Sequence, residues 1–257
     1  MKISANLSLL FTERPLLERI QAAAEAGFDG VEVQFPYELP AALFKEHLAR
    51  AALPLVLINV PAGDLMQGGL GLAAVPARQA EFDRALQDAL AYAAVVQPQC
   101  VNVLAGRLAE KQGRERALDC LAENLRKSAE SFASLGIQLV CEAINPLDMP
   151  GFLINTPEDL DLLLRQVDHP NCLAQFDLYH MARQGLGIPQ GIRLLAKRIG
   201  HVQFADSPGR GAPGTGQVDF AEALQTLNAV GYEGWMGAEY KPAGPTGLSL
   251  GWLEAWR

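Results

Sequence analysis

The chain has 257 residues, of which 49% are hydrophobic, and its 21 basic and 29 acidic side chains give a net charge of −8. This length allows one large domain or two small ones. The negative charge argues against nucleic acid or an anionic lipid surface as a partner. The N-terminal residues lack a signal-peptide pattern, and no run of about 18 apolar residues predicts a membrane span. Four scattered cysteines without a C-x-x-C pair are typical of a reducing compartment, so we expect a cytoplasmic protein.

Apolar, β-prone runs alternate with amphipathic, helix-prone runs along the whole chain. The expected strands cover residues 3–9, 30–35, 54–60, 100–104, 137–142, 172–177, 201–205 and 235–240. The expected helices cover residues 12–26, 40–51, 76–96, a long stretch around 118–129, 156–167, 191–198 and a segment that starts at residue 219. Glycine-rich loops are expected at residues 61–75 and 207–216.

Strict alternation of strands and helices predicts a parallel sheet. Eight such units in about 250 residues match the size of a closed (β/α)8 TIM barrel, and no change in composition marks a linker. We therefore predict an α/β protein in which residues 1–257 form a single barrel domain. An open doubly wound sheet is the alternative. It would spread the polar strand ends along one edge, whereas a barrel gathers them at one mouth.

Acidic and amide side chains lie at the carboxyl ends of four expected strands. Glu142, Asp177 and Glu239 end the fifth, sixth and eighth strands, and Gln203 lies in the seventh. Each acid alone is also compatible with a salt bridge or a strand-end cap. Three acids at one mouth repel one another, and oxygen ligands favour Mg²⁺ or Mn²⁺ over zinc. We predict that these four side chains hold one Mg²⁺ or Mn²⁺ ion.

Two histidines lie near these acids in the sequence. His180 follows Asp177 by three residues, so it is either a substrate-binding side chain or an ordinary loop histidine. His201 shares a strand face with Gln203, because residues two apart point the same way. We interpret His201 as a core histidine below the metal, satisfied by a backbone group.

Four strand-end segments resemble the hydroxypyruvate isomerases, a family of the xylose-isomerase-like TIM barrels. The segments are EAIN at 142–145, QFDLYH at 175–180, IGHVQFAD at 199–206 and GWMGAEY at 234–240. The resemblance extends to residues 4–8, 31–37 and 102–106 and thus covers nearly the whole chain. It implies the same four metal ligands, with Glu142 and Glu239 also moving protons. Sugar epimerases of the superfamily commonly have histidine where this chain has Gln203.

The chain departs from the family pattern at three places. Ala143 stands where a proline usually follows the first glutamate, and Leu70 stands where the loop after the third strand usually carries an arginine. The loop after the seventh strand has Gly211, Ala212 and Gln217 where histidine and glutamate are usual. These changes spare the expected metal ligands and affect the expectation about the substrate.

The expected reaction interconverts hydroxypyruvate and tartronate semialdehyde (2-hydroxy-3-oxopropanoate) through an enediolate that the ion stabilises. Glu142 and Glu239 would serve as the base and the acid, in an order that the sequence leaves open. The substrate is a small anion, so nearby cations should bind its carboxylate. The candidate substrate-binding residues are His180, Arg210, Lys241, Asn6, Asn102 and Glu32.

Other functions remain open at this stage. The substrate could be a four-carbon 2-oxo acid (2-oxo-tetronate), or the reaction a keto-sugar 3-epimerisation. A metal-dependent endonuclease on the same barrel is disfavoured by the charge of −8 and by only four histidines. A non-catalytic metal- or ligand-binding barrel is the alternative from a different class. We expect no nucleic-acid or membrane partner, and a homo-oligomer is left open.

Overall fold

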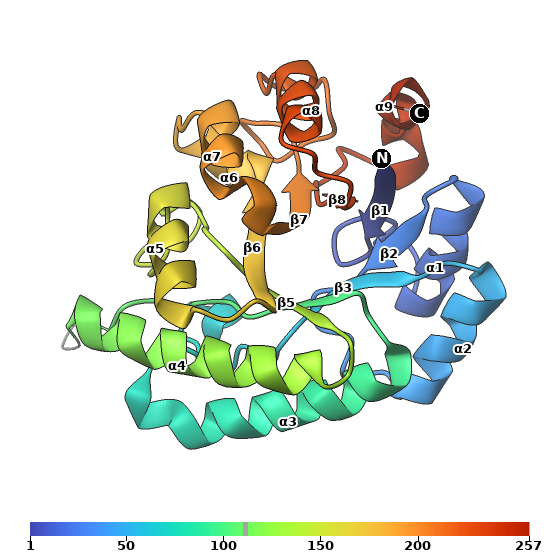
Figure 1. Ribbon diagram of the computed structural model, residues 1–257. Coiled ribbons are helices and arrows are strands. Elements are labelled where there is room, and N and C mark those ends of the chain that lie inside the picture. The colour runs from blue at the N-terminus through green and yellow to red at the C-terminus, as the bar shows by residue number, and fades with distance from the viewer. Residues whose placement is uncertain (110–112, 257) are drawn as a thin grey trace.

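This computed structural model describes residues 1–109 and 113–256. Eight strands form a closed barrel in chain order, and β8 pairs with β1 to close it (Figure 1). All neighbouring strands are parallel. The strands are β1 (Lys2–Asn6), β2 (Gly30–Glu32), β3 (Leu55–Asn59), β4 (Cys100–Asn102), β5 (Gln138–Glu142), β6 (Cys172–Asp177), β7 (Ile199–Phe204) and β8 (Trp235–Ala238). The predicted (β/α)8 barrel is confirmed.

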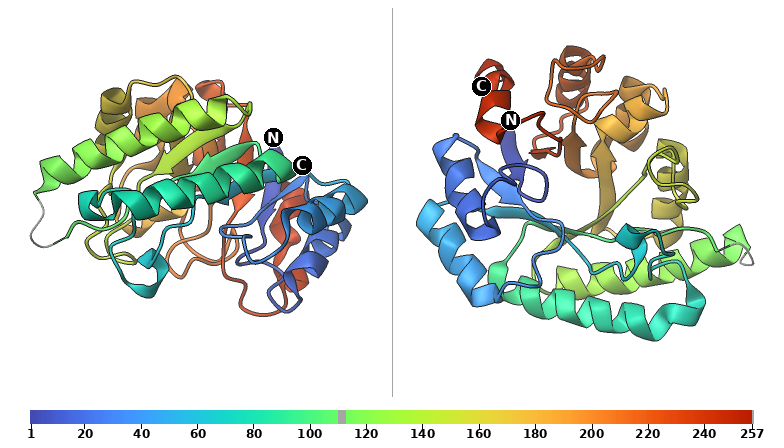
Figure 2. Two further views of the ribbon diagram at one scale, coloured as in Figure 1. Left: turned by 90° about the horizontal axis from the view of Figure 1, so that it is seen from below. Right: turned by 180° about the vertical axis from the view of Figure 1, so that it is seen from behind.

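Helices surround the barrel, as the two further views in Figure 2 show. They are α1 (Leu16–Glu25), α2 (Ala41–Ala51), α3 (Gln79–Val96), α4 (Arg114–Ala133), α5 (Pro157–Val167), α6 (Leu178–Arg183), α7 (Ile188–Leu195), α8 (Phe220–Ala229) and α9 (Gly251–Ala255). Four short 3₁₀ turns among the described residues are η1 (Leu65–Gln67), η2 (Pro76–Arg78), η3 (Ala196–Arg198) and η4 (Thr246–Ser249). The strands therefore have apolar neighbours outside the barrel, which explains their nearly continuous apolar sequences.

Two helices begin at side-chain caps. The Thr156 hydroxyl accepts a hydrogen bond from the backbone N–H of Asp159 at 3.1 Å, at the start of α5. The Asp219 carboxylate accepts from the N–H of Glu222 at 2.9 Å, at the start of α8. Each cap satisfies an N–H group that has no partner within its helix.

Several boundaries differ from the predicted ones. The strand expected at residues 3–9 ends at Asn6, because the Asn6 carbonyl accepts from the N–H groups of Leu9 and Leu10 and the chain turns there. A short helix, α6, follows Asp177 directly, where no helix was predicted. The Asp177 carboxylate caps this helix by accepting from the N–H of Tyr179 at 2.8 Å. His180 belongs to that helix, which determines where its side chain lies.

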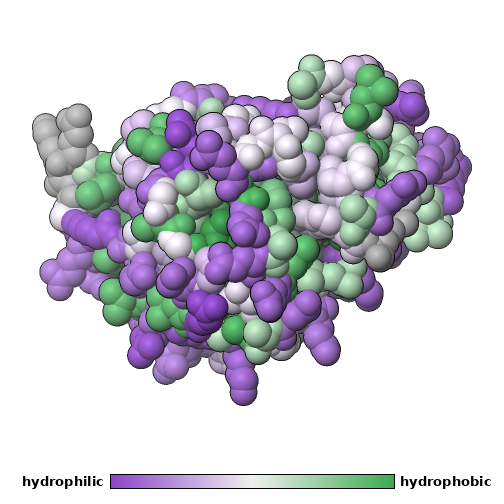
Figure 3. Space-filling view, turned by 90° about the horizontal axis from the view of Figure 1, so that it is seen from above, coloured by the Kyte–Doolittle hydropathy of each residue, from purple (hydrophilic) through white to green (hydrophobic). Residues whose placement is uncertain are grey.

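The helices, the surface and the cysteines can be compared with what the composition led us to expect. No helix within the described residues is both long and apolar enough to cross a membrane. Figure 3 shows hydrophilic and hydrophobic side chains interspersed over one face, with most of the projecting ones hydrophilic. The four cysteines are buried and unpaired, as small apolar side chains in the core.

Candidate active site

A cavity of about 450 Å³ lies at the carboxyl ends of the strands. Six of the predicted site residues line it, namely Glu142, His180, Gln203, Arg210, Glu239 and Lys241. Another part of its wall is apolar and includes Phe35, Leu57, Met66, Leu104, Ile144 and Met149. The barrel therefore brings charged and polar groups from four distant segments to one side of a partly apolar cavity, the arrangement typical of ligand sites in this fold.

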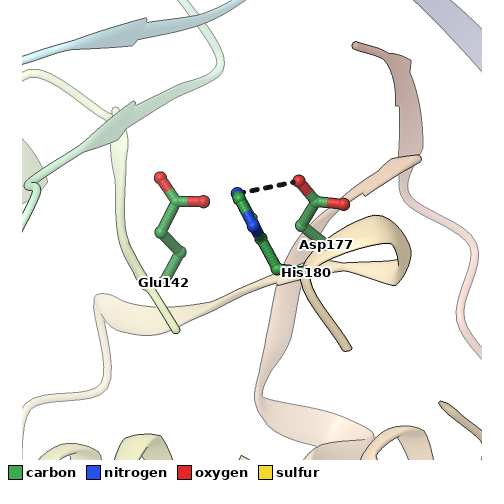
Figure 4. A group of neighbouring side chains, drawn as sticks. All are labelled: Glu142, Asp177 and His180. Carbon is green, nitrogen blue, oxygen red and sulfur yellow. Dashed lines mark ion pairs between the residues drawn. The ribbon is translucent and has the colours of Figure 1, made fainter. Parts of the chain in front are cut away.

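Glu142, Asp177 and His180 form a compact buried group. Each offers one ligand atom, and these three atoms lie within 4.8 Å of one another. Figure 4 shows the two carboxylates on either side of the His180 ring. Glu142 ends β5 and Asp177 ends β6, while His180 lies in α6. Atoms at this separation could hold a metal ion.

The Glu142 carboxyl group has a raised pKa. Its Oε1 accepts a hydrogen bond from Asn102 Nδ2 at 2.7 Å. Burial, together with the negative charges of Glu239 and Asp177, raises the pKa of Glu142 to about 8. This carboxyl group can therefore either hold or release a proton near neutral pH.

Asp177 presents one carboxylate oxygen to the interior of the site. Its Oδ2 lies 3.5 Å from His180 Nε2 and 3.8 Å from the Arg210 guanidinium. Within the described residues this buried oxygen has no hydrogen-bond partner. Burial raises the pKa of Asp177, although the charge of Arg210 opposes the shift. A buried acceptor of this kind fits a site for a cation or a ligand donor.

Glu239 follows β8 and is held from two sides. Its Oε1 accepts from Asn6 Nδ2 at 3.1 Å and from Gln34 Nε2 at 2.7 Å. Its Oε2 accepts from the Arg210 guanidinium, which also lies over the Tyr179 ring at 5.1 Å from its centroid. Burial raises the pKa of Glu239, and Arg210 counteracts part of that effect.

Gln203 is held in place by a buried carboxylate beneath it. Its Nε2 donates to Glu32 Oε2 at 2.8 Å, and its Oε1 accepts from Gln175 Nε2 at 2.7 Å. Glu32 also accepts from the Ser4 hydroxyl at 2.6 Å. The amide oxygen of Gln203 keeps a second lone pair that can bind a cation or accept a hydrogen bond.

Glu32 and His201 form a buried pair below the site. His201 Nε2 lies 2.8 Å from Glu32 Oε1. Burial alone would raise the pKa of Glu32, but the charge and hydrogen bond of His201 contribute to a net lowering. His201 is a buried core histidine, as expected, but its Nε2 meets a carboxylate from β2 across the barrel where a backbone group was expected.

Three predicted substrate-binding residues lie beneath the cavity wall. Asn6, Glu32 and Asn102 are each fully buried. Their side chains contact the acids and amides of the site, as described above, and the cavity lining does not include them. This position suits residues that orient the acids.

The two predicted cations occupy different positions. Arg210 lies beside Glu239 and Asp177, whereas Lys241 is exposed at the rim of the cavity. The Lys241 backbone N–H donates to the Arg210 carbonyl at 2.7 Å, which joins the segment after β8 to the loop after β7. Arg210 is therefore the cation next to the acids.

Sequence reasoning missed several polar residues of the site. Gln34 lies two residues after Glu32, just beyond the end of β2, and Gln175 lies two residues before Asp177 on the same face of β6. Asn59 ends β3 and also lines the cavity. A search for every polar side chain at a strand end would have found them.

Gly237 leaves the space that Glu32 needs. A Cβ atom added at Gly237 would lie 2.2 Å from Glu32 Oε1. Gly237→Ala should therefore lower the free energy of unfolding by about 2–4 kcal/mol, because the buried carboxylate would have to leave its partners. Chemical denaturation measures this change. Gly244→Ala, where no atom lies within 4 Å, is the control and should stay within about 0.5 kcal/mol of wild type. Equal stabilities of the two variants would contradict the packing argument.

The chain belongs to the xylose isomerase-like TIM barrel family, whose model matches residues 20–256. Two curated relatives are similar over nearly their full length. The hydroxypyruvate isomerase of Escherichia coli (strain K12) is 37% identical over 257 residues, which cover 100% of each chain. The 2-oxo-tetronate isomerase of Pectobacterium atrosepticum is 37% identical over 255 residues, which cover 99% of this chain and 97% of the relative. Because both of these relatives are named isomerases and match over nearly their full length, the chain is an isomerase. The resemblance inferred from its motifs is confirmed.

A solved structure has nearly the same fold. The crystal structure of an AP endonuclease of family 2 from Brucella melitensis superposes with a TM-score of 0.95 at 36% identity. The match covers 100% of this chain and 99% of that one. Close similarity in fold thus extends to a protein described by a different activity, so the function must be argued from the site.

Proposed function

We propose that this protein is a metal-dependent isomerase that interconverts hydroxypyruvate and tartronate semialdehyde. The observation that carries the proposal is the convergence of three buried acids, Glu142, Asp177 and Glu239, whose pKa values burial raises. The names of the two full-length relatives support an oxo-acid substrate. An isomerisation of this kind needs groups that exchange protons with carbon near neutral pH, which the raised pKa of Glu142 provides.

The donor set fits one Mg²⁺ or Mn²⁺ ion. Glu142, Asp177, Gln203 and Glu239 would hold it, all through oxygen atoms, and Asp177 Oδ2 is a buried acceptor without a hydrogen-bond partner in the described part of the chain. When bound, a divalent ion supplies a positive charge that stabilises the negative charge developing on the oxygens of the substrate.

The two glutamates would move the protons on carbon. Glu142 ends β5 and Glu239 directly follows β8. These strands are not neighbours in the barrel, so the two glutamates approach a substrate from different strands. One removes a proton from the hydroxymethyl carbon, and the other delivers a proton to the adjacent carbon, while the hydroxyl proton passes to the neighbouring oxygen. The apolar wall limits the access of water to the enediolate.

The remaining polar residues would bind and orient. Arg210 and Lys241 would neutralise the carboxylate of the substrate, and His180 would contact one of its oxygens. Asn6 and Asn102 would act through Glu239 and Glu142, because they donate to those carboxylates from below.

A four-carbon 2-oxo acid is the second candidate substrate. The cavity of about 450 Å³ has room beyond a three-carbon acid, and part of its wall is apolar. The relative from Pectobacterium atrosepticum is named for such a substrate. A keto-sugar 3-epimerisation is less well supported, because Gln203 stands where the epimerases commonly have histidine.

A substrate panel tests the proposal. Hydroxypyruvate, 2-oxo-tetronate and a ketohexose are supplied with Mg²⁺, Mn²⁺ or a chelator, and products are followed by NMR in deuterated water. Turnover of an oxo acid that the chelator abolishes and metal restores is expected. Equal turnover with chelator would contradict the metal dependence. Metal binding without deuterium exchange into any substrate would favour a binding barrel, and cleavage of abasic DNA would favour a nuclease.

The raised pKa of Glu142 predicts a pH-dependent stability in the presence of a chelator. The pKa rises from an ordinary value of 4.5 to about 8, so between these values the folded protein holds a proton that the unfolded chain has released. The free energy of unfolding should therefore fall as pH rises from about 5 to 8, by on the order of 4 kcal/mol. Urea denaturation at several pH values measures the slope. Glu142→Gln should reduce the slope, to which Asp177 and Glu239 also contribute, and an unchanged slope would contradict the assignment to Glu142.

A further inference from the structure

The Asn145 side chain has only one orientation that satisfies its surroundings. Asn145 is fully buried in the loop after β5. Its Oδ1 accepts from the backbone N–H groups of Leu147, at 3.1 Å, and Asp148, at 2.9 Å. Its Nδ2 donates to Asp148 Oδ2 at 3.2 Å and lies 2.7 Å from His180 Nδ1. A reversed amide would place like groups against one another at the three contacts with residues 147 and 148.

This orientation decides which His180 nitrogen carries a proton. Asn145 Nδ2 has only hydrogens to offer, so His180 Nδ1 must accept and cannot itself be protonated. A ring whose Nδ1 accepts a hydrogen bond cannot be an imidazolium, so the ring is neutral. A neutral ring carries one proton, which therefore lies on Nε2.

His180 Nε2 points into the group of acids. It lies 3.5 Å from Asp177 Oδ2, and the ring stands between the Asp177 and Glu142 carboxylates (Figure 4). A protonated Nε2 has no lone pair for a metal ion. Glu142 and Asp177 therefore offer oxygen acceptors at this point, whereas the tautomer set by Asn145 makes His180 a hydrogen-bond donor.

The partners of Asn145 are themselves fixed. Asp148 Oδ2, which accepts a hydrogen bond from the Asn145 amide, also accepts one from the Tyr179 hydroxyl at 2.6 Å. The other carboxylate oxygen, Oδ1, lies 3.4 Å from Arg183 Nε. Tyr179 directly precedes His180 in α6. The network therefore ties the loop after β5 to the helix that carries the histidine, and it leaves the ring little freedom to rotate.

We propose that Asn145 is a positioning residue that holds His180 as a neutral Nε2–H donor, which hydrogen-bonds to an oxygen of the hydroxy-oxo acid substrate and does not coordinate the metal ion. The donation to substrate rests on the proposed function. A neutral donor at this point stabilises negative charge that develops on the substrate oxygen. It does so without adding a proton donor as acidic as an imidazolium.

Histidine NMR tests the tautomer without any need for activity. The chain has only four histidines, so long-range proton–nitrogen spectra of ¹⁵N-histidine-labelled protein can be assigned with single variants. We expect a protonated Nε2 and a bare Nδ1 at His180 from pH 6 to 8. Asn145→Asp replaces the donor with an acceptor, so Nδ1 should become protonated. A wild-type His180 protonated at Nδ1, or an unchanged pattern in Asn145→Asp, would overturn the proposal. If Asn145→Asp does not fold, the wild-type spectrum alone decides the tautomer.

Asn155→Asp is the matched control. It makes the same chemical change in the same loop region, where the Asn155 amide donates to the Ile144 carbonyl at 2.8 Å. It should destabilise that loop and yet leave the nitrogen pattern of His180 as in wild type. A shift of His180 in this control equal to that in Asn145→Asp would show that the effect is only loss of loop structure.

Calorimetric titration with Mn²⁺ distinguishes whether His180 is a hydrogen-bond donor or a metal ligand. His180→Ala should keep the wild-type affinity within about threefold, whereas Asp177→Asn should lose about tenfold or more. Equal losses in both variants would make His180 a ligand and overturn the proposal. Absence of Mn²⁺ binding in the wild type would instead refute the proposed metal dependence, and NMR would still decide the tautomer.

Discussion

Glu142→Gln and Glu239→Gln should each reduce the turnover of the oxo acid by about 10²-fold or more. An amide cannot accept a proton from carbon, although it has nearly the same shape as the carboxyl group. Both positions are buried, and the nearly isosteric glutamine keeps their packing, so the barrel should remain folded. Steady-state turnover and the exchange of substrate protons with deuterated solvent measure the loss at each carbon.

The two exchange measurements can separate the roles of the glutamates. If one removes the first proton, its variant should lose solvent exchange at the hydroxymethyl carbon, while the other variant loses exchange at the adjacent carbon. Glu130→Gln, on an exposed position of α4, is the control and should keep wild-type rates. A Glu142 or Glu239 variant with near-normal turnover would show that this residue only holds the ion.

Arg210→Ala should raise the KM for acid substrates by about 10- to 100-fold and affect an uncharged ketose much less. The reason is its position: the guanidinium is mostly buried beside Glu239 and lies 3.8 Å from Asp177, where a substrate carboxylate would otherwise meet only negative charge. Steady-state kinetics on both classes of substrate provide the measurement. Arg210→Lys keeps the charge but cannot form two parallel hydrogen bonds, so its KM should fall between those of the wild type and Arg210→Ala.

Two comparisons make this result specific. Lys241→Ala should have a smaller effect, because that side chain is exposed and its charge is screened by water. Arg193→Ala, on an exposed position of α7, should have none. Equal losses on charged and neutral substrates in Arg210→Ala would show that the residue organises the loop after β7 and does not recognise the carboxylate.

The sequence by itself determined the architecture and the place of the acids. Alternating apolar strands and amphipathic helices specify a parallel barrel, because each pattern buries its apolar residues in only one kind of structure. In a closed parallel barrel the carboxyl ends of all strands meet at one mouth. Glu142, Asp177 and Glu239 could therefore be grouped from their positions along the chain alone, without any knowledge of loops. The identity of the ion and the roles of these residues stay predictions.

Only the tertiary structure decided which partner each polar group has. Glu32 and His201 come from opposite parts of the sequence, and nothing local indicates that they lie 2.8 Å apart. The helix α6, missed in the sequence because it is short, sets the direction of His180, and the loop amide of Asn145 sets its tautomer. Such contacts depend on side-chain directions and loop conformations accurate to a fraction of an ångström. Periodicity and residue type can place a side chain at a strand end or in a loop, but they do not give its direction or its partner. Hydrogen bonds between distant segments form only once the barrel has closed.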